Sequence, residues 1–370
     1  MKKSKINYGI IIPLVIFFII SVLSIYSATK NTSSNQIVIK QVIWYLVGFA
    51  ILIITAKKSL KFITDYAIVF YIAGNILLFL LLIFGTEING SKCWFTIPGI
   101  GSFQPSEFMK LALILINAKV FSYFDNKYPK RTFKNDLVIF FTVMVITLIP
   151  SILTFLEPDT GMVIIYFLIS FVMLFIYGIK KRIFLIIFIL AGVFVGAFLY
   201  YYFNFQDSFI DVFGTSFFYR IDRILDWSNK SGMQLTNALA AIKAAGLFGF
   251  GVGNTPIYIP ESHTDFIFSV FSSNFGFVGT LLLIITIVIF DYALIRLAQN
   301  TKDKNLKFII IGFVTMILYQ QIQNIGMNIG LLPITGITLP FISYGGSSLL
   351  SYILGITLIV NYDKSIHNGV

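Results

Sequence analysis

Long uninterrupted apolar runs constrain this chain more than any other feature of its sequence. The run YGIIIPLVIFFIISVLSIYSA, residues 8–28, reaches the roughly 20 residues that a helix needs to cross a bilayer. It is too long for a removable signal peptide and lacks the small-residue cleavage site of one. Apolar residues make up 57% of the 370 and charged residues only 12%, which excludes a water-soluble domain of this length. The sequence therefore predicts a polytopic helical membrane protein.

The pattern predicts ten spans, and the basic residues orient them. The expected spans lie near 8–28, 37–56, 66–84, 106–124, 137–155, 162–179, 183–203, 266–295, 306–326 and 346–361. Basic residues gather at the N-terminus and in every second connection: Lys2, Lys3, Lys5, Lys57, Lys58, Lys61, Lys127, Lys130, Arg131, Lys134, Lys180, Lys181, Arg182, Lys302, Lys304 and Lys307. Because cytoplasmic loops retain Lys and Arg, these connections and both termini are expected in the cytoplasm. The long fourth outward connection, about 204–265, is then extracellular.

Charge and cysteine content limit the function classes. This topology signal explains most of the net charge of +11, with some attraction to anionic membrane lipids, so the charge calls for no nucleic acid. Cys93 is the only cysteine, which excludes an intramolecular disulfide and a thiolate metal cluster. With no soluble domain, low-complexity linker or clear repeat in the sequence, we expect residues 1–370 to form one all-α membrane domain.

Two outward stretches combine apolar residues with helix breakers. Residues 85–110 contain Gly and Pro that break a helix, and Trp94 suits the headgroup zone. Glu107 and Lys110 lie three apart at the start of a span, which fits an intrahelical ion pair or a role in substrate binding. In residues 324–348, Pro and Gly prevent a continuous helix, and the apolar character predicts packing into the outward mouth.

The long fourth outward connection contains basic residues in its first half and several glycines in its second half. Arg220 and Arg223 share a face if their segment is helical, which suits an amphipathic surface helix or a clamp for a diphosphate. Residues 235–261 are apolar but broken by glycines, which favours a re-entrant segment beside a cavity, with interfacial helices as the alternative. Their GFGVG piece is not the dinucleotide fingerprint, and no Walker lysine is present, so nucleotide binding is disfavoured.

Three ionisable residues stand side by side where the eighth span begins. They are Glu261, His263 and Asp265, followed by a run almost without charge. Spacing alone is best explained by Asp265 acting as a helix N-cap, with Thr264 as a competing cap. The three residues do not have the spacing of a metal site.

Several pieces of the sequence together resemble the RodA/FtsW family, called SEDS for shape, elongation, division and sporulation. The matching pieces, in the family's order, are NGSKCWF, GSFQPSEFMKL, LEPDTGM, YRIDRI, PESHTDFIF and NIGMNIGLLPITGITLPFISYGGSS. The resemblance covers essentially the whole chain and includes the ten-span plan with a large fourth outward loop.

The resemblance implies peptidoglycan glycosyltransfer on the outer face of a bacterial plasma membrane. The implied substrate is lipid II, a disaccharide-peptide on undecaprenyl diphosphate, and the implied partner is a class B penicillin-binding protein. It marks Asp265 as the catalytic residue, which we expect to act as the single base of an inverting transfer, and Trp94 as important. We expect His263 and Glu261 to fix the loop around Asp265.

The sequence departs from the family in the fourth outward loop. It has GNTPIYIPE where members carry a Ser-x-x-Lys-like piece, so Arg220, Arg223 or Lys243 would supply positive charge to the diphosphate. Ser273 and Asn274 replace a glutamate pair that is usual in the family. Outside this loop, Glu157-Pro158-Asp159 replaces the Gln-Pro-Asp that is usual in the family.

Two other functions stay open at this point. A lipid II flippase would place polar groups near the bilayer midplane, whereas most spans here lack them. A non-catalytic scaffold that activates a penicillin-binding protein would tolerate the loss of Asp265. No cofactor can be inferred from the sequence, and a divalent cation at the diphosphate is compatible with it.

Overall fold

The computed structural model describes residues 8–30, 35–56, 58–88, 91–97, 101–215, 217–218 and 232–362. The elements are α1 (Tyr8–Thr29), α2 (Asn35–Thr55), the 3-10 helix η2 (Lys61–Thr64), α3 (Ala67–Phe84), β1 (Thr86–Ile88), β2 (Ser91–Ile97), β3 (Gly101–Phe103), α4 (Pro105–Lys127), α5 (Phe133–Leu156), α6 (Thr160–Tyr177), α7 (Lys181–Asn204), α8 (Gln206–Phe213), α10 (Met233–Ala244), α11 (Ile267–Asn300), α12 (Lys304–Asn328) and α13 (Gly346–Val360).

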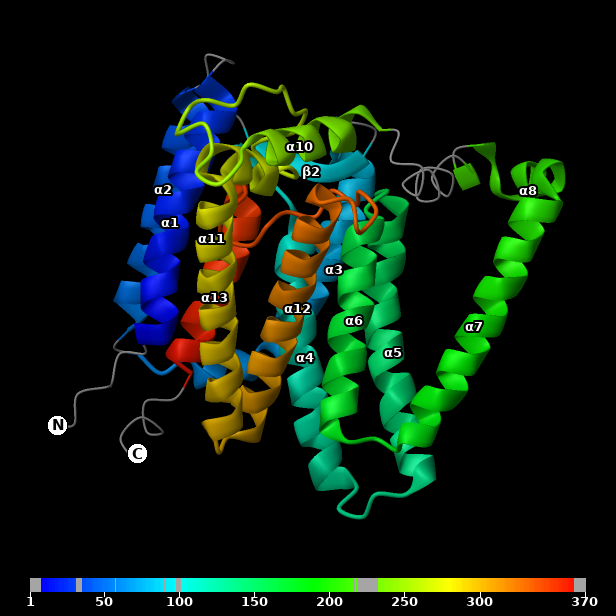
Figure 1. Cartoon of the computed structure of the whole chain (residues 1–370). Helices are drawn as coiled ribbons and strands as arrows, with labels where there is room; N and C mark the ends of the chain where they lie inside the picture. Colours follow the sequence, from blue (N-terminus) through cyan, green and yellow to red (C-terminus); the bar gives the residue numbers. More distant parts are fainter. Residues whose placement is uncertain are drawn as a thin grey trace.

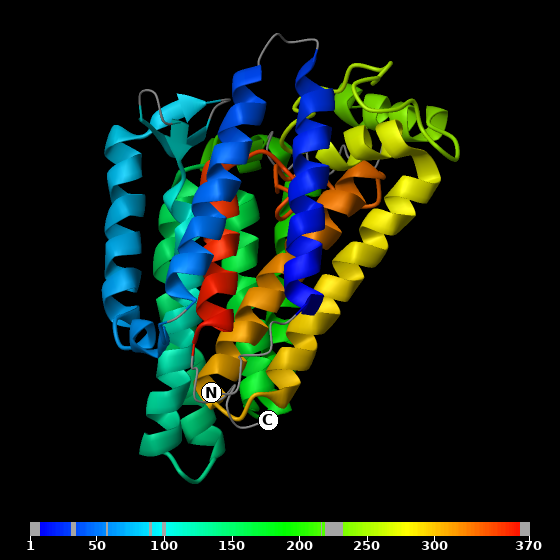
Figure 2. The ribbon, with the colours of Figure 1, turned by 90° about the vertical axis from the view of Figure 1, so that its left-hand side faces the viewer.

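The long helices form one bundle (Figure 1). Eight of those described are long and apolar enough to cross a membrane: α1, α2, α3, α5, α6, α7, α11 and α12. The remaining two expected spans are α4 and α13, which run alongside the others (Figure 2). The α13 helix has only 15 residues, and α4 carries charged side chains. The ten expected spans thus correspond to ten helices, and the polytopic helical membrane fold is confirmed.

The helices differ greatly in how much of their surface the protein covers. The apolar window of α12 is 72% buried within the protein, whereas that of α7 is 6% buried. In Figure 1, α7 starts beside α5 and leans away from it toward the upper end of the bundle. Central helices such as α4 and α12 can hold polar groups because neighbouring helices shield them from lipid.

The connections divide between two ends of the bundle. What we call the basic end holds the turns between α2 and α3, α4 and α5, α6 and α7, and α11 and α12, at the bottom of Figure 1. The end of α13 lies there too, because the Leu60 N–H donates to the Asn361 carbonyl at 2.8 Å. The loop end holds the described parts of residues 85–104 and 205–266, together with residues 329–345. The described basic residues of the even-numbered connections therefore share one end, whereas both chain termini lie outside the described residues.

The loop end contains a small sheet that the sequence did not predict. Strands β1, β2 and β3 pair antiparallel in that order, at the end of α3 (Figure 2). Within β2, Trp94 lies opposite Thr86, whose hydroxyl donates to the Trp94 carbonyl at 2.8 Å. The helical bundle therefore carries a small three-stranded sheet at its loop end, while the helical fold class that the sequence predicts holds.

The fourth outward connection also differs from its preferred interpretation. The α10 helix lies across the loop end instead of entering the bundle (Figure 1). Its buried residues, Leu235, Ala238 and Ala241, are spaced three apart and form one narrow apolar face. The position of α10 agrees better with the interfacial alternative than with a re-entrant segment, and its depth in the membrane stays a prediction.

The glycine-rich loop after α10 is fastened to a kink in α11. Gly276 has a φ of 64° inside the helix, which interrupts the regular backbone hydrogen bonds. The Phe277 N–H donates instead to the Gly246 carbonyl at 3.0 Å. The Val278 N–H donates to the Leu247 carbonyl, also at 3.0 Å. The kink thus leaves donors free, and the loop satisfies them.

Candidate functional site

Asp265 lies at the loop end, directly before α11. That helix begins at Ile267, and no side chain caps it, so the N-cap explanation for Asp265 and Thr264 is wrong. The Asp265 side chain is partly exposed. A Cβ atom placed on Gly336 would lie 3.7 Å from the Asp265 Oδ2, so the carboxylate faces the loop between α12 and α13.

Two buried asparagines of α12 hold the backbone at Asp265. The side-chain amides of Asn324 and Asn328 donate to the Asp265 carbonyl at 2.9 and 3.0 Å. The Asn328 Oδ1 accepts from the Ser269 N–H at 3.1 Å and from the Ser269 hydroxyl at 2.6 Å. These contacts bind the start of α11 to the end of α12.

The segment that follows α12 holds the two residues before Asp265. The Ser343 hydroxyl donates to the Thr264 carbonyl at 2.6 Å. The Tyr344 N–H donates to the His263 carbonyl at 2.9 Å. The segment 324–348 was singled out by its composition, but the sequence assigned these side chains no role. Their contacts join residues about 60 to 80 positions apart, so no local signal could have revealed them.

The surroundings of Asp265 make its carboxylate a stronger base. Burial raises the pKa of Asp265 from 3.8 to about 7, the negative charge of Glu261 adds to the rise, and a hydrogen bond with Thr264 opposes it. Burial also lowers the pKa of His263, against a smaller opposing effect of Glu261. A carboxylate that titrates near neutral pH has the property that a general base needs.

Glu261 and His263 lie beside Asp265 in the same turn. Glu261 is exposed and adopts a φ of 51°, and its carboxylate accepts from the Thr264 hydroxyl at 3.3 Å. The His263 ring lies 5.8 Å from the ring of Tyr344. These contacts agree with the loop-fixing role that we expect of both residues, which stays a prediction.

Glu107 and Lys110 form a buried ion pair inside α4. The Lys110 Nζ lies 2.7 Å from the Glu107 carboxylate, and both residues are at most 1% exposed. Lys110 also donates to the Gln320 side chain at 3.4 Å and lies 5.2 Å from the centre of the Tyr352 ring. The geometry therefore favours the intrahelical ion pair, and the substrate-binding role of the two residues stays a prediction.

Two acidic residues, Glu157 and Asp159, lie between the end of α5 and the start of α6. The Asp159 carboxylate caps α6 through the Met162 N–H at 3.1 Å and accepts from Gln104 at 3.0 Å. Glu157 is fully buried, and neither carboxylate oxygen has a hydrogen-bond partner among the described residues. Burial, with a smaller contribution from Asp159, raises the pKa of Glu157 to about 8. Burial therefore favours the protonated form of Glu157.

Four candidate residues remain, and the structure describes two of them. Trp94 is partly buried in β2, and Lys243 is exposed in the last turn of α10. Arg220 and Arg223 lie outside the described residues. Among the residues that are described, no three His, Cys, Asp or Glu side chains come together as a metal site.

Comparison with known proteins shows which family this chain belongs to. The cell cycle protein family of FtsW, RodA and SpoVE matches residues 4–368. The chain belongs to this FtsW/RodA/SpoVE family. The match spans nearly all of the chain, and it confirms the resemblance found in the sequence pieces.

Members of the FtsW/RodA/SpoVE family from several bacteria are similar to this chain. Stage V sporulation protein E of Bacillus subtilis is 36% identical, with 78% of this chain and 76% of that protein aligned. The probable peptidoglycan glycosyltransferase FtsW of the same organism is 31% identical, over 99% of this chain and 93% of that protein.

Solved structures of the FtsW/RodA/SpoVE fold agree with the bundle. One chain of a peptidoglycan synthase complex that coordinates polymerization and crosslinking has a TM-score of 0.76 at 26% identity, covering 98% of this chain and 97% of that chain. The rod shape determining protein RodA of Thermus thermophilus has a TM-score of 0.70 at 25% identity, covering 100% and 98%.

Asn274 shows how this FtsW/RodA/SpoVE member accommodates its departure from the family pattern. Its buried side-chain amide donates to the carbonyls of Gly251 and Asn254 at 3.0 and 3.2 Å. A glutamate carboxylate has no hydrogen to donate to these carbonyls. Its backbone carbonyl lies against Gly249, where a Cβ atom would overlap it. The asparagine and the glycine loop therefore fit each other.

Replacing Asn328 by Ala is expected to lower the free energy of unfolding by about 2 kcal/mol or more, because buried polar groups at Ser269 and Asp265 lose partners. Polymerisation should fall as well, since the Asp265 backbone is held less firmly. Thermal unfolding in detergent and glycan synthesis would measure both effects. Asn204→Ala is the control, because Asn204 bonds only within exposed α7. Equal behaviour of the two variants would contradict this role of Asn328.

Proposed function

We propose that this protein is a peptidoglycan glycosyltransferase that polymerises lipid II into glycan strands. The observation that carries the proposal is the Asp265 carboxylate, partly exposed at the loop end and with its pKa raised to about 7. Membership of the FtsW/RodA/SpoVE family supports it, since close relatives are named as probable peptidoglycan glycosyltransferases.

The proposed reaction needs one base and one leaving diphosphate. Asp265 accepts the proton of the acceptor sugar's hydroxyl group as that oxygen bonds to the anomeric carbon of the donor. The bond from this carbon to the diphosphate oxygen breaks, and undecaprenyl diphosphate leaves with the electron pair. Direct displacement inverts the anomeric carbon and requires no covalent enzyme intermediate.

Positive charge must stabilise the departing diphosphate. Lys243, exposed at the end of α10, is the described candidate, and Arg220 and Arg223 belong to the same connection. Guanidinium groups suit this task because their donors match phosphate oxygens in pairs. Among the described residues, no three His, Cys, Asp or Glu side chains come together to hold a divalent cation.

The orientation of the bundle follows from its charges. Basic residues gather in the connections of the basic end, and cytoplasmic loops retain such residues. We therefore place the loop end, with Asp265, on the outer face of a bacterial plasma membrane. There a lipid-anchored donor and a growing glycan in water can both reach the carboxylate.

A class B penicillin-binding protein is the proposed partner. The support is the likeness to a chain of a complex that coordinates polymerization with crosslinking. Such a partner would crosslink the peptides of the strands that this protein makes.

The direct test is glycan synthesis from purified lipid II, with and without a candidate class B penicillin-binding protein. Polymer of increasing length, resolved on gels, is the expected result. Reorientation of lipid II in vesicles without polymer would favour a flippase instead. Polymer only from the partner, unaffected by Asp265→Asn, would favour a scaffold.

The rate of polymerisation should rise with pH through about 7, because the base form of Asp265 is the ionised carboxylate. Glu261→Gln removes the neighbouring charge that raises the pKa of Asp265, so the midpoint of the pH profile should move to lower pH. Initial rates between pH 5 and 9 at saturating lipid II measure both. An unchanged midpoint in the variant would argue that another group titrates.

A further inference from the structure

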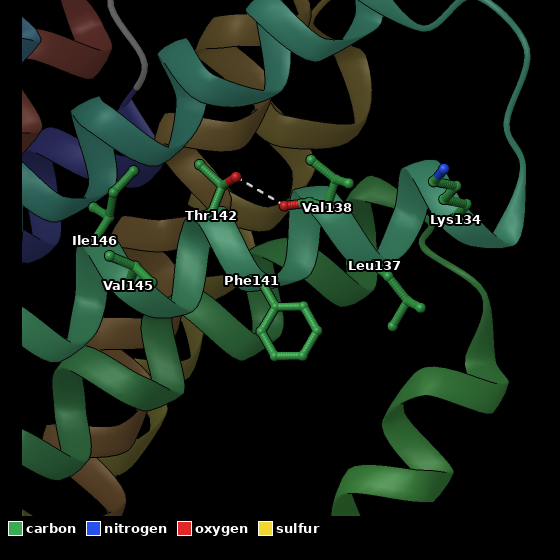
Figure 3. Close-up of a pocket in the computed structure, with 7 residues that line it drawn as sticks. All are labelled: Lys134, Leu137, Val138, Phe141, Thr142, Val145 and Ile146. Carbon is green, nitrogen blue, oxygen red and sulfur yellow. Dashed lines mark hydrogen bonds between the residues drawn. The ribbon is translucent and has the colours of Figure 1, made fainter.

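An open apolar groove runs along α5 from the basic end. Its hollow of about 570 Å³ is lined by one face of the helix: Lys134, Leu137, Val138, Phe141, Thr142, Val145 and Ile146 (Figure 3). The Thr142 hydroxyl donates to the Val138 carbonyl of its own helix at 2.8 Å, so the groove offers little free polarity. Phe141 and Val145 are largely exposed. The groove is thus apolar along its length and has a lysine at its start.

A second hollow of about 610 Å³ lies at the same end, between the starts of α5 and α7. It is lined by Phe133, Lys180, Lys181, Arg182 and Ile186. The two helix starts are joined, because the Lys180 N–H donates to the Asp136 carboxylate at 3.1 Å. The Lys180 Nζ lies 6.0 Å from the centre of the Phe133 ring. Phe133 directly precedes Lys134, so the two hollows lie next to each other.

Four basic side chains surround these hollows, and we call them the α5–α7 basic cluster: Lys134, Lys180, Lys181 and Arg182. No acidic side chain in the described part of the chain forms an ion pair with any of them. The Asp136 carboxylate, which accepts from the Lys180 backbone, already forms an ion pair with the Arg131 guanidinium at 3.5 Å. Elsewhere at the basic end, Lys304 is paired with Asp125 at 2.9 Å. The cluster therefore presents uncompensated positive charge beside an apolar groove.

We propose that the α5–α7 basic cluster and the adjoining groove bind an anionic phospholipid of the leaflet at the basic end. Its phosphate headgroup contacts the cluster, and its acyl chains lie along Leu137, Phe141 and Val145. Basic pockets between membrane helices on the cytoplasmic side suit such headgroups. The first turn of α7 has no side-chain cap, and the positive end of its helix dipole adds to the attraction for an anion.

The net charge of the headgroup determines which class of phospholipid this site should prefer. A zwitterionic choline headgroup would bring its own cation next to the cluster, so phosphatidylcholine is disfavoured relative to phosphatidylglycerol. The bound lipid would also fill the space between α5 and α7. The protein buries only 6% of the apolar segment of α7. The inference concerns a site at the opposite end from Asp265 and does not depend on the proposed reaction.

The test uses quenching of a tryptophan by phospholipids with brominated acyl chains. Phe141→Trp places the fluorophore in the groove of the full-length protein, and the signal of the three native tryptophans is subtracted with the parent chain. Brominated phosphatidylglycerol is expected to bind at this position at least roughly 25-fold more tightly than brominated phosphatidylcholine, at roughly fivefold for each basic residue near the headgroup.

Two controls separate the site from general charge attraction. Tyr292→Trp is exposed on α11 at a similar depth from the basic end and should show little preference. In the Phe141→Trp protein, Lys134→Gln with Lys181→Gln should reduce the preference about tenfold or more. Lys302→Gln with Lys307→Gln removes the same charge from the connection between α11 and α12 and should leave the preference intact.

Equal quenching by the two lipids at Phe141→Trp would overturn the proposal. So would an equal loss of preference in the two double-lysine variants, because that would reduce the effect to net charge. Thermal unfolding of each variant in detergent shows that the compared proteins are folded.

Discussion

Asp265→Asn is expected to reduce glycan polymerisation from lipid II by about 100- to 10,000-fold, the usual contribution of a general base. The amide keeps the size of the carboxylate but cannot take the proton of the acceptor hydroxyl group. The carbonyl of residue 265 still accepts from Asn324 and Asn328, so the local backbone should stay in place. Polymer length and initial rate, measured on purified protein, are the readouts.

The same substitution should leave stability unchanged or raise it. Burial raises the pKa of Asp265 in the folded protein above its ordinary value of 3.8. A group with a raised folded pKa stabilises the fold fully below its unfolded pKa, and this contribution is lost as pH rises through about 7. At pH 8 the ionised carboxylate is therefore a cost, which the neutral amide removes. Thermal unfolding at pH 8 checks this.

Asp207→Asn is the matched control for this experiment. Asp207 is an exposed aspartate in α8, also at the loop end, and its substitution should leave polymerisation near that of the parent protein. Polymer from Asp265→Asn at the level of this control would remove Asp265 from the proposed chemistry.

Lys110→Met should destabilise the protein by about 3–5 kcal/mol, because it leaves the buried Glu107 carboxylate without its counter-ion. The Lys110 Nζ and the Glu107 carboxylate are only 2.7 Å apart and both side chains are buried, so the carboxylate would lose its partner in a site shielded from solvent. Methionine has a similar length, which limits the cavity that the substitution leaves. Thermal or denaturant unfolding in detergent is the measurement.

A double variant separates the structural role of this pair from a role in substrate binding. Glu107→Gln combined with Lys110→Met has no buried charge and should regain most of the lost stability. It should also regain polymerisation if the pair acts only within the bundle. A stable but inactive double variant would show that Glu107 or Lys110 serves the substrate.

The spans could be predicted because each one is a single continuous segment of the sequence. The bilayer demands about 20 apolar residues for every helix, so α1 and α11 are visible without knowledge of their neighbours. The charges in α4 did not hide it from sequence reasoning, although its composition alone falls short. Neighbouring helices bury two of those charges, Glu107 and Lys110, and this burial depends on the tertiary structure.

The loop end could be predicted less well. The strands β1, β2 and β3 are short, and their register depends on pairing across turns that Gly and Pro allow but do not specify. The glycines of this loop suggested a re-entrant segment, whereas one of them, Gly249, packs closely against Asn274 in α11. The sequence shows the glycine but does not show which distant residue packs against it.

The candidate site shows the same division. Asp265 was identified from the resemblance of its local motif to a family, and the Glu261 and His263 beside it came with that motif. The asparagines that hold Asp265 lie in α12, about 60 residues further along the chain. The Arg220 and Arg223 predictions lie outside the described residues and stay predictions.

The sequence by itself determined the number of spans, the separation of basic residues to one end, and the acidic residue at the edge of the eighth span, because each depends on the chemistry of neighbouring residues and on the bilayer. Only the tertiary structure decided that α10 lies across the bundle and that Lys110 neutralises Glu107 away from the surface. It also decided that burial brings the pKa of Asp265 close to neutral pH. These properties depend on which distant segments exclude water from a given group, and that information is absent from any single stretch of the chain.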